Sequence, residues 1–202
     1  LRPVRSVEVL QGAPTRRLPD GREEAVPAEF WRLRSSPCPW PQGYLVGTRE
    51  GKIALITRDL KRAGDIELPS EVAGTVVFQH ARLTRKDMAF ACGSNGVLYA
   101  VDLGDRKIAW NITLGKSCSF GPAIGAGGVI AVSDEGRLVK CAVHSPDIAW
   151  SFEAGDAPAA EPVIADLGGS PRALLVLRKG SLVCVDLERG SVVFRLDEQQ
   201  FK

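Results

Sequence analysis

Short apolar runs recur along the chain from about residue 28, and each one leads into a turn that contains glycine. After each glycine, apolar and polar residues alternate again, as in Gly96-Val97-Leu98-Tyr99-Ala100. Paired apolar runs about a glycine turn are typical of β-hairpins, because a tight turn needs a positive φ that glycine adopts without steric cost. We therefore predict four equivalent hairpins. The runs are Tyr44–Gly47, Met88–Cys92, Val129–Val132 and Ala173–Leu177, and the glycines predicted to have positive φ are Gly51, Gly96, Gly136 and Gly180.

Two further landmarks keep the same period, so the chain is a repeat. The turn glycines are 45, 40 and 44 residues apart, and Trp110, Trp150 and Phe194 each lie 14 residues after one of them. The first unit has Gly64-Asp65-Ile66 in place of the aromatic residue. Each unit also opens with a short step, Ser36-Pro37, Thr75-Val76, Gly121-Pro122 or Glu161-Pro162.

A unit of this length with four short strands and no helical period is the size of one β-propeller blade. The sequence thus predicts an all-β fold, a partial or incomplete β-propeller of about four four-stranded blades at residues 35–69, 72–115, 118–155 and 158–197. We expect the proline-marked strand to be the inner one and the aromatic-marked strand the outer one. Trp110 and Trp150 are then predicted to be largely buried, filling matching places between successive blades.

The first 34 residues have a different composition from the repeats. They hold seven arginines, five acidic residues and four prolines, without a sustained period, so we predict an irregular arm with a linker at residues 9–27. Val4–Leu10 alternates like a strand, and Phe30–Leu33 has the aromatic residues of an outer strand. This stretch is therefore also expected to hold strands of a preceding blade.

The best unit, Gly96-Val97-Leu98-Tyr99-Ala100-Val101-Asp102 followed by Lys107-Ile108-Ala109-Trp110, resembles the PQQ-like, quinoprotein-type propeller repeat, and Gly180 to Asp186 is the next best copy. The resemblance covers residues 35–196 and implies a ring of seven or eight blades, of which four are present. Trp110–Cys141 is similar to the C-terminal repeats of aminoadipate-semialdehyde-dehydrogenase-like acyl-CoA synthetases. That similarity implies an accessory domain beside adenylation chemistry.

The chain departs from the quinoprotein enzymes of that family, which hold pyrroloquinoline quinone with adjacent cysteines and a calcium ion. No two cysteines are adjacent, and the only asparagines are Asn95 and Asn111, at a turn and in an outer strand. Asp102 and Asp186 are interpreted as turn-forming residues rather than calcium ligands. We expect no cofactor and no metal, and a quinone dehydrogenase is the least favoured alternative.

Other candidate chemistry is sparse. The five cysteines have no CxxC spacing and are interpreted as small apolar core residues in a reducing compartment. His80 and His144 are the two histidines, and neither lies near a nucleophile motif. Gly125–Gly128 is followed by no helix, so it is predicted to be a loop rather than a phosphate site. No catalytic, cofactor-binding or metal-binding residue is predicted.

Charge and composition narrow the function further. The 202 residues are 45% hydrophobic and 25% charged with a net charge of +2, and beyond residue 34 there are 19 basic and 19 acidic residues. This balance argues against nucleic acid as a partner. No apolar run is long enough to cross a membrane. We expect a non-catalytic binding or scaffold module in the cytoplasm, whose partner is another protein or the remaining blades of its own protein. A secreted, periplasmic or lumenal location, in which glycosylation of Asn111 would matter, stays open.

Overall fold

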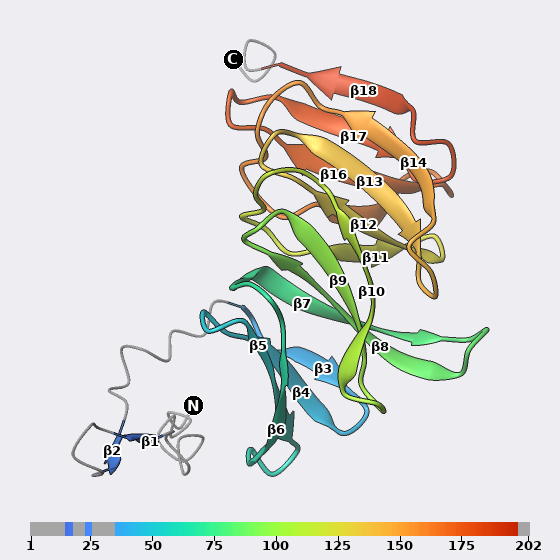
Figure 1. Cartoon of the computed structure of the whole chain (residues 1–202). Helices are drawn as coiled ribbons and strands as arrows, with labels where there is room; N and C mark the ends of the chain where they lie inside the picture. The colour runs from blue at the N-terminus through green and yellow to red at the C-terminus, as the bar shows by residue number, and fades with distance from the viewer. Residues whose placement is uncertain (1–14, 18–22, 26–34, 198–202) are drawn as a thin grey trace, which may run out of the picture.

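A computed structural model describes residues 15–17, 23–25 and 35–197 of the chain. Within these ranges every regular element is a β-strand, so the described residues include no helix that could span a membrane. Residues 35–197 form four four-stranded antiparallel sheets that follow one another along an open arc (Figure 1). The predicted fold class, an incomplete β-propeller with four blades, is confirmed.

Each blade uses four consecutive strands, paired in chain order from an inner strand to an outer strand. Blade 1 contains β3 (Cys38–Trp40), β4 (Gly43–Gly47), β5 (Lys52–Thr57) and β6 (Arg62–Glu67). Blade 2 contains β7 (Val72–Ala81), β8 (Lys86–Gly93), β9 (Val97–Asp102) and β10 (Lys107–Thr113). Blade 3 contains β11 (Ala123–Gly125), β12 (Gly128–Val132), β13 (Arg137–Ala142) and β14 (Ile148–Glu153). Blade 4 contains β15 (Val163–Asp166), β16 (Pro171–Val176), β17 (Leu182–Asp186) and β18 (Val192–Leu196).

The four repeat glycines lie in the turns between the second and third strands, as predicted. Their φ angles are +73° at Gly51, +76° at Gly96, +89° at Gly136 and +83° at Gly180. At Gly96 and Gly136 the space for a side chain is also filled, because the chain leaving the blade crosses the turn. A Cβ at Gly96 would lie 2.2 Å from the carbonyl oxygen of Gly115, and one at Gly136 would lie 2.3 Å from that of Asp156.

Substitution at two glycines separates backbone strain from this steric conflict. Gly127 has a φ of +71°, close to the +76° of Gly96, yet a Cβ there would meet nothing within 4 Å. We expect Gly127→Ala to lower the free energy of unfolding by about 1 kcal/mol through strain alone. Gly96→Ala should cost roughly 2 kcal/mol, because Gly115 must also move. Urea denaturation of both variants measures the difference, and equal losses would show that the crossing chain yields freely.

A β-bulge occurs at the same place in the outer strand of every blade. The bulged residues are Ala63, Ala109, Ala149 and Val193, each skipped in the pairing of the third and fourth strands. The bulge sets Trp110 opposite Ala100, Trp150 opposite Lys140 and Phe194 opposite Cys184, four residues after the turn glycine in each case. The repeat therefore includes an irregularity that places the aromatic side chain on the face turned to the next blade.

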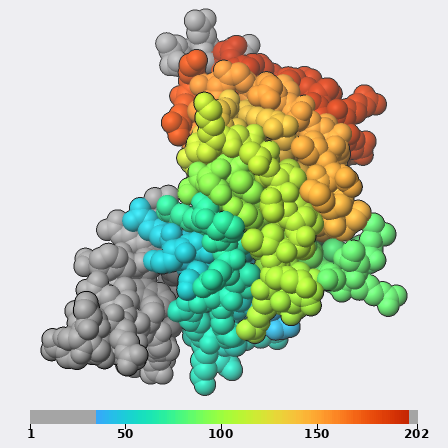
Figure 2. Space-filling model, viewed as in Figure 1, coloured from blue at the N-terminus to red at the C-terminus, as the bar shows by residue number. Residues whose placement is uncertain are grey.

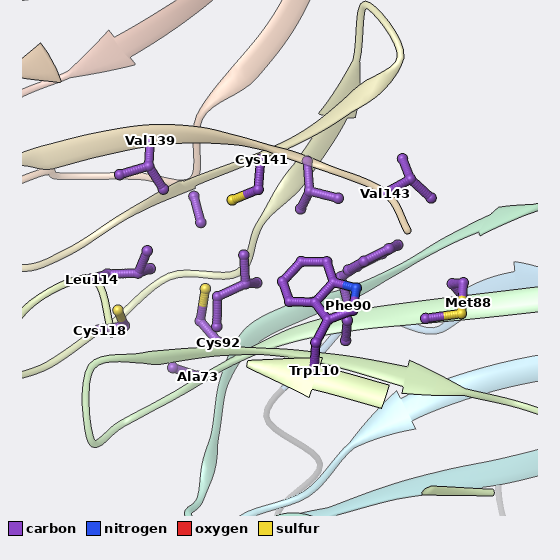
Figure 3. Close-up of a cluster of buried hydrophobic side chains, with 14 of the residues drawn as sticks. Ala73, Met88, Phe90, Cys92, Trp110, Leu114, Cys118, Val139, Cys141 and Val143 are labelled. Carbon is purple, nitrogen blue, oxygen red and sulfur yellow. The ribbon is translucent and has the colours of Figure 1, made fainter. Parts of the chain in front are cut away.

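Three apolar clusters lie between successive blades and form the core. The middle cluster joins blade 2 to blade 3, and in it Trp110 is 9% exposed. Its ring packs on Phe90, with 5.8 Å between ring centroids, and faces Val139 and Cys141 of blade 3 (Figure 3). The predicted burial of Trp110 between two blades is confirmed.

The other two aromatic positions differ from Trp110. Trp150 is half-buried rather than largely buried: it lies against the turn at Gly190, and its Nε1–H donates to the carbonyl oxygen of Leu187 at 3.0 Å. Phe194 is 37% exposed, because no described blade follows blade 4. The equivalent place in blade 1 is Gly64, and the guanidinium of Arg106 lies 2.7 Å from where its Cβ would be.

The predicted linker at residues 9–27 contains a short regular element. β1 (Thr15–Arg17) and β2 (Glu23–Ala25) pair antiparallel, with Arg16 opposite Glu24 and Arg17 opposite Glu23. The strands proposed at Val4–Leu10 and Phe30–Leu33 lie outside the described residues.

Candidate functional site

The hairpin of β7 and β8 in blade 2 breaks the regularity of the repeat. β7 has ten residues and β8 has eight, whereas the first two strands of the other blades have three to six. The hairpin projects beyond its neighbours, as the green arm on the right of Figures 1 and 2 shows. Its tip at residues 82–85 is exposed, and a surface hollow lies on each side of it.

The first hollow, which we call the charged hollow, has a volume of about 350 Å³ and lies between blade 1 and the hairpin. Most of its charged groups are paired with one another: Lys86 Nζ lies 2.5 Å from Asp102 and 3.5 Å from Asp105, and His80 Nδ1 lies 2.8 Å from Asp87. Arg85 also borders this hollow and forms no ion pair with a described residue. Hydrogen bonding and attraction to Asp102 raise the pKa of Lys86. Apart from Arg85, the described charges that line the charged hollow satisfy each other and have little left to offer a ligand.

Asp102 and Asp186 accept the hydrogen bonds that close two equivalent turns, so both are turn-forming residues as the sequence predicted. Asp102 Oδ1 accepts hydrogen bonds from the N–H groups of Gly104 and Asp105 at 2.9 and 3.0 Å. Asp186 Oδ1 accepts from the N–H groups two and three residues later at 2.8 and 2.9 Å, and its other oxygen pairs with Arg172. The two carboxylates thus hold the turns between the third and fourth strands of blades 2 and 4.

Because these turns depend on charged carboxylates, we expect the folded protein to lose stability in acid. Burial disfavours the charge on Asp102, but its hydrogen bond to Lys86 and those from the turn outweigh that effect, so its pKa lies below the ordinary value. The turn hydrogen bonds and Arg172 likewise lower the pKa of Asp186. Both carboxylates therefore stabilise the fold above the unfolded pKa of about 3.9, and that contribution is lost as the pH falls through the lower folded value.

The measurement is urea denaturation from neutral pH into the acid range. We expect the double variant Asp102→Asn/Asp186→Asn to be less stable than the parent at neutral pH and to show a shallower loss in acid. An unchanged acid slope would mean that other carboxylates control it.

The second hollow, which we call the hairpin groove, has a volume of about 420 Å³ and lies between the hairpin and blade 3. It is lined by Gln79, His80, Ala81, Arg82, Leu83, Gly127, Val143 and His144. The two histidines, 64 residues apart in the sequence, border the same groove. Sequence reasoning did not bring them together, because their proximity depends on how far the hairpin extends toward the turn of blade 3.

Glu161, in the step Glu161-Pro162 that opens the fourth unit, joins three blades. Its Oε1 accepts hydrogen bonds from the N–H of Thr75 in blade 2 at 2.6 Å and from the N–H of Gly121, before blade 3, at 3.2 Å. A Cβ at Gly121 would lie 2.2 Å from the carbonyl oxygen of Thr75, so the two backbones approach closely. The carboxylate therefore has a structural position between blades.

The cysteines are core residues rather than reactive groups. All five are free, and four of them are buried. A hydrogen bond with Cys118, together with burial, raises the pKa of Cys92, and burial raises that of Cys141 to about 12. Both remain thiols at neutral pH, which suits apolar packing between blades 2 and 3 (Figure 3). The described part of the chain contains no group of three His, Cys, Asp or Glu side chains that could hold a metal ion.

The outward face of blade 4 is an apolar surface without a covering blade. Val176 is 45% exposed where its equivalent in blade 2, Cys92, is 0% exposed, and Phe194 is 37% exposed where Trp110 is 9% exposed. Leu174, Leu182 and Leu196 complete this face and are half-buried. We call these five residues the open face.

The chain matches no protein-family model and no curated protein. Among solved structures it is similar to BamB from Moraxella catarrhalis, with a TM-score of 0.67 and 17% identity over 82% of this chain and 49% of that one. It is also similar to BBS1N in complex with ARL6DN, with a TM-score of 0.66 and 14% identity over 87% of this chain and 57% of that one. The chain thus spans about half the length of these structures, and neither supports a link to acyl-CoA synthetases. The likeness shows the fold: the chain forms four blades of a β-propeller.

Proposed function

We propose that this chain is a non-catalytic scaffold, a rigid part of a larger propeller that binds protein through its open end and its loops. The observation that carries the proposal is the open face: positions that are buried between blades 2 and 3 are apolar and exposed on blade 4. Contiguous exposed apolar surface on a folded protein marks an interaction site. The occupant that fits is a further blade, because each preceding blade already receives one at these positions.

The surfaces with pockets support a binding role rather than catalysis. No serine, threonine or cysteine is among the described residues that line the charged hollow or the hairpin groove, so neither pairs a histidine with a nucleophile. Propeller loops on a rigid frame are well suited to partner binding. BBS1N, one of the similar structures, was solved in complex with ARL6DN, which is consistent with a propeller that binds protein.

The experiment that tests this proposal introduces positive charge on the open face by substitution. Sedimentation velocity and binding of a hydrophobic fluorescent dye compare the parent chain with Val176→Arg/Phe194→Arg. We expect the parent to self-associate and to bind dye, and the double variant to do neither while keeping its thermal midpoint. The matched control is Leu60→Arg/Ile148→Arg, at residues that are 41% and 43% exposed elsewhere. If the control abolishes association equally, or the open-face variant unfolds, the open face is not a binding surface.

A further inference from the structure

The hairpin groove combines an apolar floor with an exposed apolar rim and a cationic side chain. Its floor is apolar, since Ala81 is 3% and Val143 is 8% exposed. Its rim carries Leu83, which is 80% exposed, the highest value among the large hydrophobic residues of the described chain that face solvent. None of the described residues that line the groove is acidic. An apolar floor and an isolated exposed leucine on a projecting arm mark a surface suited to contact with another molecule.

The cations at the hairpin tip are available to a ligand. Arg82 and Arg85 are exposed, and neither forms an ion pair with any residue that the structure describes. In contrast, Lys86 at the base of the tip is already paired with Asp102. A planar guanidinium binds a carboxylate through two parallel hydrogen bonds, so unpaired arginines favour acidic partners.

The acidic groups nearby are already engaged on their own elements. Asp87 accepts from His80 Nδ1 at 2.8 Å, and Asp147 accepts from Ser145 Oγ at 2.6 Å beside His144. They leave Arg82 facing the groove as its strongest uncompensated charge. The groove is also accessible from the blade 3 side, because a side chain at Gly127 would meet nothing within 4 Å. Figure 2 shows the green arm beside and below the orange end of blade 3.

We propose that the hairpin groove binds an acidic peptide segment of a partner protein, with a carboxylate on Arg82 and an apolar side chain between Leu83 and Val143. This assignment rests on the proposed function and names the class of partner. A peptide fits better than a nucleic acid, since polyanion binding relies on many phosphate contacts and the groove has one unpaired arginine, Arg82, on a chain with a net charge of +2. Charge on the rim and an apolar anchor in the centre is the ordinary arrangement of a protein interface.

Fluorescence anisotropy with a labelled peptide, Glu-Asp-Leu-Glu-Phe-Asp-Glu, tests the assignment on the whole chain. We expect saturable binding that weakens about tenfold with Arg82→Glu and several-fold with Leu83→Ser. The matched controls are Arg189→Glu and Leu60→Ser, exposed positions away from the groove, and they should leave the affinity unchanged. A peptide with lysine in place of each acidic residue should not bind.

Several outcomes overturn the assignment. They are absence of saturable binding, equal losses in the control variants, or tighter binding of single-stranded RNA or anionic lipid vesicles than of the peptide. The variant Val176→Arg/Phe194→Arg keeps the groove intact and should bind the peptide normally. Failure of the peptide to bind, with the open face behaving as expected, would remove the groove assignment and leave the scaffold proposal in place.

Discussion

Replacing Trp110 by alanine should lower the free energy of unfolding by about 3–5 kcal/mol, the range for a large aromatic side chain removed from a core. The same change at Phe194 should cost less than about 1 kcal/mol, as expected of a side chain with little to pack against. The two residues have the same offset from a turn glycine and the same pairing after a bulge. They differ in what lies beyond them, since Trp110 meets blade 3 and Phe194 meets solvent.

Urea denaturation of both variants measures the contrast. Phe194→Ala is the matched control for Trp110→Ala, because strand, face and register are shared. Asn111→Asp is a second control, since Asn111 is exposed on the other side of β10 and should have little effect. Equal losses at Trp110 and Phe194 would mean that blade position does not decide burial and that the open end is not open.

Replacing Glu161 by alanine should cost about 2–3 kcal/mol, because it leaves two backbone N–H groups between closely packed inner strands without their charged acceptor. Those groups belong to Thr75 and Gly121, in parts of the chain 86 and 40 residues away from Glu161. The loss should therefore appear as a weakening between blades 2 and 3 rather than within blade 4.

Hydrogen exchange of the backbone N–H groups shows which strands are weakened by the substitution. We expect faster exchange at the inner strands of blades 2 and 3 in Glu161→Ala, and unchanged exchange in β17. Glu161→Gln keeps a carbonyl oxygen as acceptor and should recover about half of the lost stability. If glutamine were as damaging as alanine, the hydrogen bonds to Thr75 and Gly121 would not be the cause.

The repeat could be predicted from the sequence because its landmarks are local. A glycine at a hairpin turn and an apolar alternation on either side of it need no knowledge of distant contacts. The turn roles of Asp102 and Asp186 were accessible for the same reason, since their hydrogen bonds reach only two and three residues along the chain. The common bulge was not predicted, because every blade has the extra residue at the same place and the spacing from glycine to aromatic residue is therefore the same in each.

The candidate binding surfaces depend on contacts between residues that are far apart in the sequence. The sequence analysis therefore largely missed them. Trp150 was expected to match Trp110, but its burial depends on how the turn at Gly190 in the next blade covers it. The hairpin groove combines Arg82 and Leu83 with His144 of another blade. The gap from the opening step at Thr75 to the apolar run at Met88 is 13 residues, only one more than the 12 from Glu161 to Ala173, so this spacing did not reveal the projecting hairpin.

The central claim is that blade 4 ends the described arc with an uncovered apolar face, and hydroxyl-radical footprinting of the dilute, monomeric chain tests it most directly. Oxidation rates at Phe90, Trp110 and Phe194 are read by mass spectrometry, with Leu83 as the exposed reference. Phe90 is 0% exposed, Phe194 is 37% and Leu83 is 80%. We predict that Phe194 is oxidised many times faster than Phe90, and that this reactivity falls when a further blade is bound. A rate at Phe194 as low as that at Phe90 would show that the face is covered within this chain and would contradict the open propeller.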